Sequence, residues 1–258
     1  MHNRQALSFI MFWECLTDWH MWPIYLIGLT WLIPNFPMGA YLTLQLRAIG
    51  FDTFQTNLLT IPAYVLFILQ LLFWTWLSEK INQRFLLGVA TQLWALPLLI
   101  ALELIPSNTG ARAKYALSVL LVGAPYVHAI LVAITSRNAG TVRTRTVASA
   151  LYNMFVQASS IIASNIYRDD DKPMYRRGNK VLLGICAYNT VLFVGAKLFY
   201  VYINKRRDKI WNSVCAEINP FQWTGQLTDI KMTQEQREEY LATTTDKGNK
   251  RLDFRFAH

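Results

Sequence analysis

Five small polar residues recur at helical spacing in one uncharged stretch of the sequence. Residues 147–167 carry no formal charge, and about 21 residues of helix cross the roughly 30 Å hydrocarbon core of a bilayer. At about 100° per residue, five polar side chains of this stretch fall within a sector of roughly 80°. We call them the polar stripe: Ser149, Asn153, Gln157, Ser160 and Ser164. The sequence therefore predicts an apolar helix with one polar face.

The polar stripe needs polar surroundings. Hydroxyls and amides that face lipid tails cost about 1 kcal/mol or more each unless they are hydrogen-bonded. A wet solute pathway would supply partners, and so would neighbouring helices, because Ser, Asn and Gln also join packed membrane helices. Two amides one turn apart, Asn153 and Gln157, favour the pathway, where they would hydrogen-bond a solute. Bonding between helices is the alternative.

One histidine lies in the middle of an apolar stretch. His128 follows Tyr126 by two residues, in the run LVGAPYVHA. An imidazole in a wet cavity can carry a proton or bind an anion; a neutral imidazole bonded to a backbone carbonyl is the structural alternative. Tyr126 would add a hydroxyl or a stacking face beside it. Tyr25 and Asn35 are candidates to meet this pair from another helix.

An array of apolar windows must position these residues. Each of six windows is long enough to cross a bilayer, and short connectors with turn or charged residues separate them. The windows are residues 21–42, 57–77, 85–105, 115–136, 147–167 and 181–203. Six crossings put residues 1–20, an interfacial lead-in, on the same side as the polar tail 204–258. A slight excess of Lys and Arg on that side favours the cytoplasm.

Two of the windows contain helix breakers. The first holds Pro34, Pro37 and Gly39, and the fourth holds Gly123 and Pro125, so the opening window of each group of three is predicted to be interrupted. Breaks at matching positions of two repeats point to the binding site of a transporter, because freed carbonyls and helix ends then face a cavity. The other interpretation is that Pro and Gly are simply commoner in membrane helices.

Composition argues against a soluble protein. Of the 258 residues, 53% are hydrophobic and 16% are charged, and the net charge of +9 gathers at window ends and in the tail. This pattern is typical of a membrane-topology signal and not of a nucleic-acid surface. The four histidines and three cysteines show no metal-ligand or disulfide spacing, and no phosphate-binding glycine loop or nucleophile elbow is present. We expect no enzyme activity, cofactor, metal site or nucleic-acid partner.

Several stretches resemble a known family. They are LTDWHMWPIYLIGLTWLIPNFP, WLSEKINQR, the segment from SRNAGTVRTRT to LLGIC, and the final EEYLATTTDKGNKRLDFRFAH. Over nearly the whole chain they are similar to the C-terminal half of fungal allantoate permease-type transporters, in the major facilitator superfamily. This resemblance implies two six-helix bundles with cytoplasmic termini, and uptake of small organic anions such as ureides, vitamins or sulfonates with protons.

Two features depart from that family. The chain starts where the seventh span of such a transporter would begin, and alternating access requires both bundles. We therefore expect it to be incapable of transport alone unless it pairs with a missing N-terminal six-helix half. Residues 214–231 also interrupt the pattern of the family, either as a translated intron or as a genuine insertion.

The expected fold is an all-α membrane protein: a six-transmembrane-helix bundle, half of a major facilitator superfamily fold, with a cytoplasmic C-terminal tail. The expected function is symport of a small anionic solute with the proton as coupling ion, in the plasma membrane, with lipid and a second half as partners. The predicted pathway residues are Tyr25, Asn35, Tyr126, His128, Asn153 and Gln157. The alternative is a non-transporting membrane protein, either a regulatory partner of a full transporter or an inert remnant.

Overall fold

The computed structural model is all-helical over the residues that it describes, as predicted. These residues are 9–48, 50–81, 83–106, 109–171, 175–218, 249 and 254–258. The α-helices are α1 (Phe9–Thr17), α2 (Trp22–Thr30), α3 (Phe36–Ala48), α4 (Thr53–Ile81), α5 (Arg84–Leu104), α6 (Ala111–Val122), α7 (His128–Asn138), α8 (Val142–Ser164) and α9 (Arg176–Ile218). A short 3-10 helix, η1 (Asp169–Asp171), precedes α9.

Within the described residues, four helices are long and apolar enough to cross a membrane. They are α4, α5, α8 from Thr144 onward, and α9 up to Ile210. They correspond to the predicted windows 57–77, 85–105, 147–167 and 181–203. A helix needs about 20 mostly apolar residues to cross a bilayer, and each of the four meets that length. The chain therefore has the helices of an integral membrane protein.

The remaining two windows each hold two helices separated by a break. Residues 31–35, with Pro34, separate α2 from α3, and residues 123–127, with Gly123 and Pro125, separate α6 from α7. A proline lacks the N–H that the helix needs and crowds the preceding turn, so the helix ends before it. The predicted interruptions are confirmed in both windows.

The other two helix breakers of the first window lie inside a helix. Pro37 and Gly39 lie in the first turn of α3, not in the break. Proline is tolerated there because the first N–H groups of a helix have no intrahelical acceptor. The break is therefore shorter than the spread of breakers in the sequence suggests.

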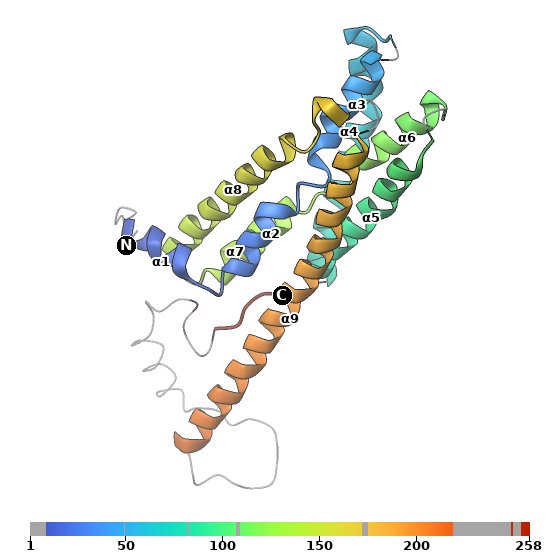
Figure 1. Ribbon diagram of the computed structural model, residues 1–258. Coiled ribbons are helices and arrows are strands. Elements are labelled where there is room, and N and C mark those ends of the chain that lie inside the picture. Colours follow the sequence, from blue (N-terminus) through green and yellow to red (C-terminus); the bar gives the residue numbers. More distant parts are fainter. Residues whose placement is uncertain are drawn as a thin grey trace.

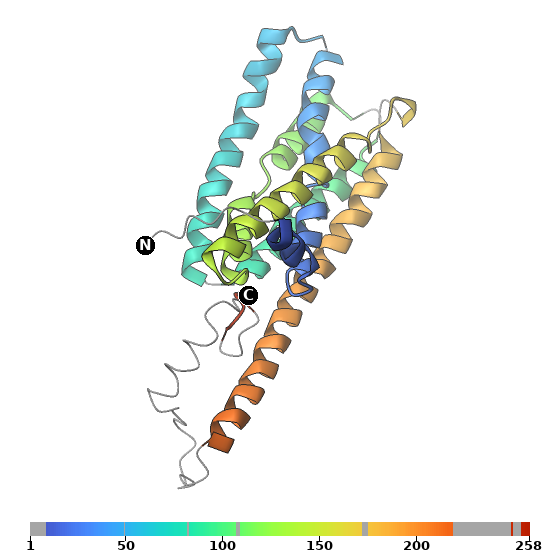
Figure 2. The same ribbon diagram turned by 90° about the vertical axis from the view of Figure 1, so that its left-hand side faces the viewer.

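The connections between helices alternate between two ends of an elongated body (Figures 1 and 2). The α3–α4, α5–α6 and α8–α9 connections lie at one end, drawn at the top in both views. The α4–α5 and α7–α8 connections lie at the other, which we call the lower end, together with α1. Residues 254–258 also lie there, against α9, and α9 itself projects beyond the lower end.

Packing is densest between α5 and α9 and sparsest around α4. Gly88 of α5 faces the ring of Phe193 of α9, and a Cβ on Gly88 would overlap that ring, so only glycine permits this approach. Of the most apolar 18-residue windows, 44% of that in α5 is buried, against 6% of that in α4. The long apolar surface of α4 therefore faces outward along most of its length.

Near both ends of the chain, the structure contains helix that was not predicted. The lead-in contains α1, whose Cys15 is buried against α8, with its Sγ 3.9 Å from Thr144 O. At the other end, α9 continues past residue 203 to Ile218, because no proline or glycine interrupts the run that follows. The segment predicted to interrupt the family pattern thus begins inside α9 at its residues 214–218, and its residues 219–231 lie outside the described part.

Candidate functional site

The first helix break is supported by two buried side-chain amides. Asn189 of α9 donates from Nδ2 to Thr30 O at 2.9 Å, and Gln92 of α5 donates from Nε2 to Trp31 O at 3.5 Å. Both amides are 0% exposed. A carbonyl at a helix end has lost its intrahelical partner, and an apolar interior offers no water to replace it. These two amides therefore stabilise the end of α2 where it breaks.

The second helix break has lighter support. Trp94 of α5 donates from its indole Nε1 to Leu120 O, near the end of α6, at 3.2 Å. Gly123 opens the break against α4, and a Cβ at this position would lie 2.6 Å from Cδ2 of Leu66. A glycine is needed for that approach unless the leucine side chain moves. This break thus depends on one indole and one close helix contact.

The two breaks face each other through aromatic rings. Trp31 of the first break and Tyr126 of the second make a T-shaped contact with centroids 5.3 Å apart. His128 begins α7, and its ring lies 6.3 Å from that of Trp31 and 5.9 Å from that of Tyr126. Figure 1 shows the helices concerned, α2 and α7, side by side in the middle of the body. The two breaks that Pro and Gly predicted therefore lie next to each other, although their windows are far apart in the sequence.

Helix α8 completes this group. The Tyr152 ring stacks on His128 at 5.6 Å, and its hydroxyl lies 3.5 Å from Nδ1 of the imidazole. The next residue, Asn153, lies beside the same imidazole, while its Nδ2 donates to Ser149 O of its own helix. Tyr152 also packs on α2 at Gly28, where a Cβ would lie 2.9 Å from its Cε2. We call Trp31, Tyr126, His128 and Tyr152 the aromatic cluster.

The aromatic cluster runs from the interior to the surface of the chain. Trp31 and Tyr152 are buried, with 1% and 0% exposure, while Tyr126 and His128 are half-buried. Asn153, at the outer edge, is exposed. A solute or water at this edge therefore has access to an imidazole, a phenol and an amide, backed by an apolar wall.

The polar stripe continues from that edge along α8. Gln157 and Ser164 are exposed, as is Asn153, and Ser149 and Ser160 are half-buried. Most of its hydrogen bonds stay within α8, such as that from Asn153 Nδ2 to Ser149 O at 2.9 Å. Asn153 also lies beside His128 of α7. Bonding between helices thus accounts for little of the stripe.

Three of the six predicted pathway residues meet in this arrangement. Tyr126 of the second break, His128 of α7 and Asn153 of α8 come together, and Gln157 lies one turn further along the exposed face of α8. An aromatic face, a titratable ring and two amides are therefore available to one ligand. This grouping follows the spacing of the sequence closely.

The other two predicted residues have separate surroundings. Asn35 ends the first break, and its Oδ1 is buried without a hydrogen-bond partner among the described residues. Tyr25 lies nearer the lower end, where its hydroxyl donates to Cys15 O at 3.4 Å and its ring stacks on Phe155 at 5.4 Å. Tyr25 is 0% exposed and does not reach the aromatic cluster. It packs α2 against α1 and α8.

Sequence reasoning missed four residues of this site. Trp31 and Tyr152 resemble ordinary core aromatics in the sequence, and only the folded chain brings them to His128. Gln92 and Asn189 did carry a signal, since each is an amide in an apolar window. An amide in a membrane helix needs a hydrogen-bonding partner, as in the polar stripe, so both residues could have been selected from the sequence.

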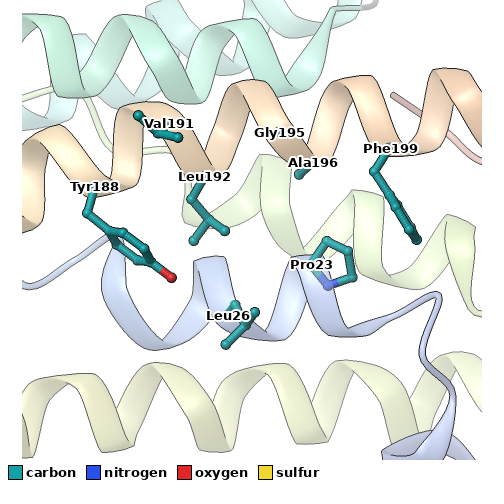
Figure 3. Close-up of a pocket in the computed structure, with 8 residues that line it drawn as sticks. All are labelled: Pro23, Leu26, Tyr188, Val191, Leu192, Gly195, Ala196 and Phe199. Carbon is teal, nitrogen blue, oxygen red and sulfur yellow. The ribbon is translucent and has the colours of Figure 1, made fainter.

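A separate hollow lies between α2 and α9 (Figure 3). It measures about 320 Å³ and is lined by Pro23, Leu26, Tyr188, Val191, Leu192, Gly195, Ala196 and Phe199. Its lining is almost entirely apolar, with the Tyr188 hydroxyl as the polar group. Such a surface suits a hydrocarbon chain better than a charged solute. The aromatic cluster is therefore the better candidate for a polar ligand.

Comparison with known proteins identifies relatives in two yeasts. The Saccharomyces cerevisiae protein YOL162W, named an uncharacterized transporter, is 46% identical over 233 residues, which are 90% of this chain and 100% of that protein. The uncharacterized transporter YIL166C of the same organism is 40% identical over 258 residues, which are 100% of this chain and 44% of that protein. In Schizosaccharomyces pombe, the uncharacterized transporter C417.10 is 27% identical over 223 residues, which are 85% of this chain and 43% of that protein.

These relatives differ in length. The chain covers the whole of YOL162W but less than half of YIL166C and C417.10. No protein-family model matches the sequence, and no solved structure matches it significantly. With 46% identity over the full length of YOL162W and with apolar helices long enough to cross a bilayer, the chain belongs to this family of fungal membrane transporters.

Proposed function

We propose that this chain forms one six-helix half of a proton-coupled carrier for a small organic anion, of the allantoate permease type in the major facilitator superfamily. Ureides, vitamins and sulfonates are the substrate classes that the resemblance implies. In this proposal α2 with α3, α4, α5, α6 with α7, α8 and α9 make six crossings. Both ends of the chain lie in the cytoplasm, and the plasma membrane is the expected location.

The observation that carries the proposal is the meeting of the two helix breaks at His128. Carriers bind solutes near the membrane midplane, where interrupted helices leave polar groups inside the protein. Here both breaks and the amide of Asn153 converge on one imidazole. A protein needing only rigid helices would gain nothing from two interruptions at the same depth, because each break loses backbone hydrogen bonds that other side chains must replace.

His128 supplies a means of coupling. A protonated imidazole attracts an anion and donates hydrogen bonds, while a neutral one offers an acceptor and no charge. Binding of an anion and of a proton would therefore favour each other at this position. Asn153 and Gln157 would orient a carboxylate, amide or sulfonate through their N–H groups, and the Tyr126 ring would form the apolar side of the site.

A second six-helix body would close the pathway. The polar stripe is exposed in this chain, and amides facing lipid are unfavourable, so a wet surface of a partner body would satisfy them. Longer relatives such as YIL166C have more than half of their length beyond the region matched by this chain. An equivalent segment is our candidate for that body. By itself, the chain is expected to give no saturable uptake.

Replacing the two amides tests the proposal. We expect Asn153→Leu combined with Gln157→Leu, made at the equivalent positions of the longer relative YIL166C, to lower anion uptake by about tenfold or more, since two hydrogen bonds to a solute contribute about 1 kcal/mol each. Uptake of labelled ureides and other organic anions is measured in yeast cells lacking the relatives, at an external pH of about 5 and of about 7.

The matched control is the equivalent of Met154→Leu, on the same exposed part of α8 but outside the polar stripe. It should leave uptake and membrane abundance unchanged. Unchanged uptake in the double variant, at equal abundance, would reject the role of the stripe in the pathway. Loss of membrane abundance in the double variant alone would instead assign the amides to helix packing.

A further inference from the structure

Outside the aromatic cluster, the best-defined polar contacts hold residues 254–258 against the lower end of the body. Asn204 of α9 makes two hydrogen bonds with one residue, accepting from Phe256 N at 2.9 Å and donating to Phe256 O at 2.9 Å. Asn138, at the end of α7, does the same with the next residue, accepting from Ala257 N at 2.7 Å and donating to Ala257 O at 3.3 Å.

These four hydrogen bonds hold an extended peptide along both of its edges. In an extended chain, the N–H and C=O of one residue point to one edge and those of the next residue to the other. Asn204 and Asn138 therefore act on opposite edges of the same peptide, each in the manner of a neighbouring β-strand. Both side chains are well buried, with 8% and 0% exposure, so these bonds form away from water. The contact is a built binding site and not a surface association.

One side chain of the peptide is also enclosed. Phe256 is 2% exposed, and its ring stacks on His20 at 5.2 Å and lies 5.3 Å from Tyr200. The guanidinium of Arg207 lies over the same ring at 4.6 Å, and its Nη1 donates to Phe254 O at 3.1 Å. The site therefore recognises a peptide backbone together with one aromatic ring.

The connection between α1 and α2 joins this assembly. Tyr200 donates from its hydroxyl to His20 O at 2.7 Å, and Asn249 donates from Nδ2 to Asp18 Oδ2 at 2.5 Å. Burial acts to raise the pKa of Asp18, but hydrogen bonds from His20 and Asn249 outweigh it and hold this pKa below its ordinary value, so the carboxylate is charged at neutral pH. Residues near both ends of the chain thus meet at one place.

We propose that residues 254–258 act as a strap, an intramolecular peptide ligand that fastens the α1–α2 connection, the end of α7 and α9 to one another. The strap closes the lower end of the body, and its release loosens all three segments together. Because the site binds main-chain groups and one ring, a peptide of another protein with an aromatic residue in extended conformation is the class of ligand that would displace it.

Hydrogen–deuterium exchange of the full chain in detergent tests the strap. We expect the amides of Phe256 and Ala257 to exchange at least about tenfold more slowly than in an unstructured peptide, because both donate to buried acceptors. Phe256→Ala and Asn204→Leu should remove this protection. They should also speed exchange at His20 and in the last turn of α7.

Arg255→Ala is the matched control within the strap. Arg255 pairs with Asp208 through Nε at 2.7 Å and Nη2 at 2.6 Å. Both side chains are partly solvent-exposed and neither bonds the Phe256 or Ala257 amide, so the loss of this pair should leave the protection of those two amides within about twofold. Unprotected amides at these two positions in the unmodified chain would overturn the proposal without any variant. So would a Phe256→Ala chain in which exchange rises in the strap but not at α7 and His20.

Discussion

The two helix breaks arise from the same sequence signal but lie in different surroundings. Two fully buried amides, Gln92 and Asn189, bind the carbonyls at the first break. One indole, that of Trp94, binds a carbonyl beside the second. The rings also differ, since Trp31 of the first break is 1% exposed while Tyr126 of the second is half-buried.

This difference assigns separate tasks to the breaks. The first is fixed by polar groups of the tightly packed α5 and α9, so it forms a stable wall behind the aromatic cluster. The second carries Tyr126 and leads into His128, the groups that a solute can reach. A proline in a membrane helix therefore marks an interruption, while the neighbouring helices decide whether it becomes a support or a binding surface.

Adding one methyl group beside each break should give the largest difference between the two breaks in the free energy of unfolding. Gly28→Ala places a Cβ against the buried ring of Tyr152, which cannot move without leaving His128, and should lower the free energy of unfolding by about 1–3 kcal/mol. At Gly123→Ala the new Cβ would lie 2.6 Å from Cδ2, 2.7 Å from Cγ and 3.0 Å from Cβ of Leu66. Leu66 is half-buried on the sparsely packed α4, which can shift away, so the cost should stay below about 1 kcal/mol. Thermal unfolding in detergent measures both.

Gly184→Ala is the reference for this comparison, because nothing lies within 4 Å of a Cβ at that position of α9. It should stabilise the chain by up to about 1 kcal/mol through helix propensity. Equal effects of Gly28→Ala and Gly123→Ala would mean that the first break is no more rigid than the second.

Removing the hydrogen bonds that support the breaks should give a smaller contrast. Asn189→Leu removes the side-chain donor to Thr30 O in an apolar interior and leaves that carbonyl with the turn bond from Ile33 N at 3.2 Å, so it should lower the free energy of unfolding by about 1–2 kcal/mol. Trp94→Phe removes the bond to Leu120 O, and its more exposed position should limit the loss to about 0.5 kcal/mol. Urea or thermal titration of both variants gives the two values.

A leucine on the exposed face of α8 serves as the control here. Gln157→Leu should change the free energy of unfolding by less than about 0.5 kcal/mol, because the side chain is exposed. A loss in Trp94→Phe that equals or exceeds that in Asn189→Leu would reverse the proposed order of the breaks.

Local signals in the sequence account for much of this fold. Apolar runs located the four long helices, and Pro34, Gly123 and Pro125 located the interruptions. Hydropathy did not predict that α9 extends to Ile218, because the last turns of this helix are polar. Their residues still favour a helix. Helix α1 was missed for a different reason: it is apolar, but nine residues are too few to cross a bilayer.

The site was predictable only where spacing determines orientation. Asn153 and Gln157 share a face because they are four residues apart, and Tyr126 and His128 are close in the chain. The position of Tyr25 depends on how α2 turns toward α1, which no local pattern reports. The contacts of Asn204 and Asn138 with residues 256 and 257 join distant segments, so they too required the folded chain.

The central claim is that the exposed face of α8 borders water and not lipid along the polar stripe. Single cysteines at Asn153 and Gln157, in a chain whose native cysteines are replaced, can be compared with cysteines at Met154 and Ile161 on the neighbouring exposed sector. The measurement is the rate of labelling by a membrane-impermeant thiol reagent, with the four cysteines placed at the equivalent positions of the longer relative YIL166C, whose additional segment is the candidate second body.

We expect Asn153→Cys and Gln157→Cys to react at least about tenfold faster than Met154→Cys and Ile161→Cys, because a thiol reacts as the thiolate and lipid suppresses its ionisation. Equal, slow labelling at all four positions would show that lipid or protein covers the stripe. The pathway proposed beside the two helix breaks would then be contradicted.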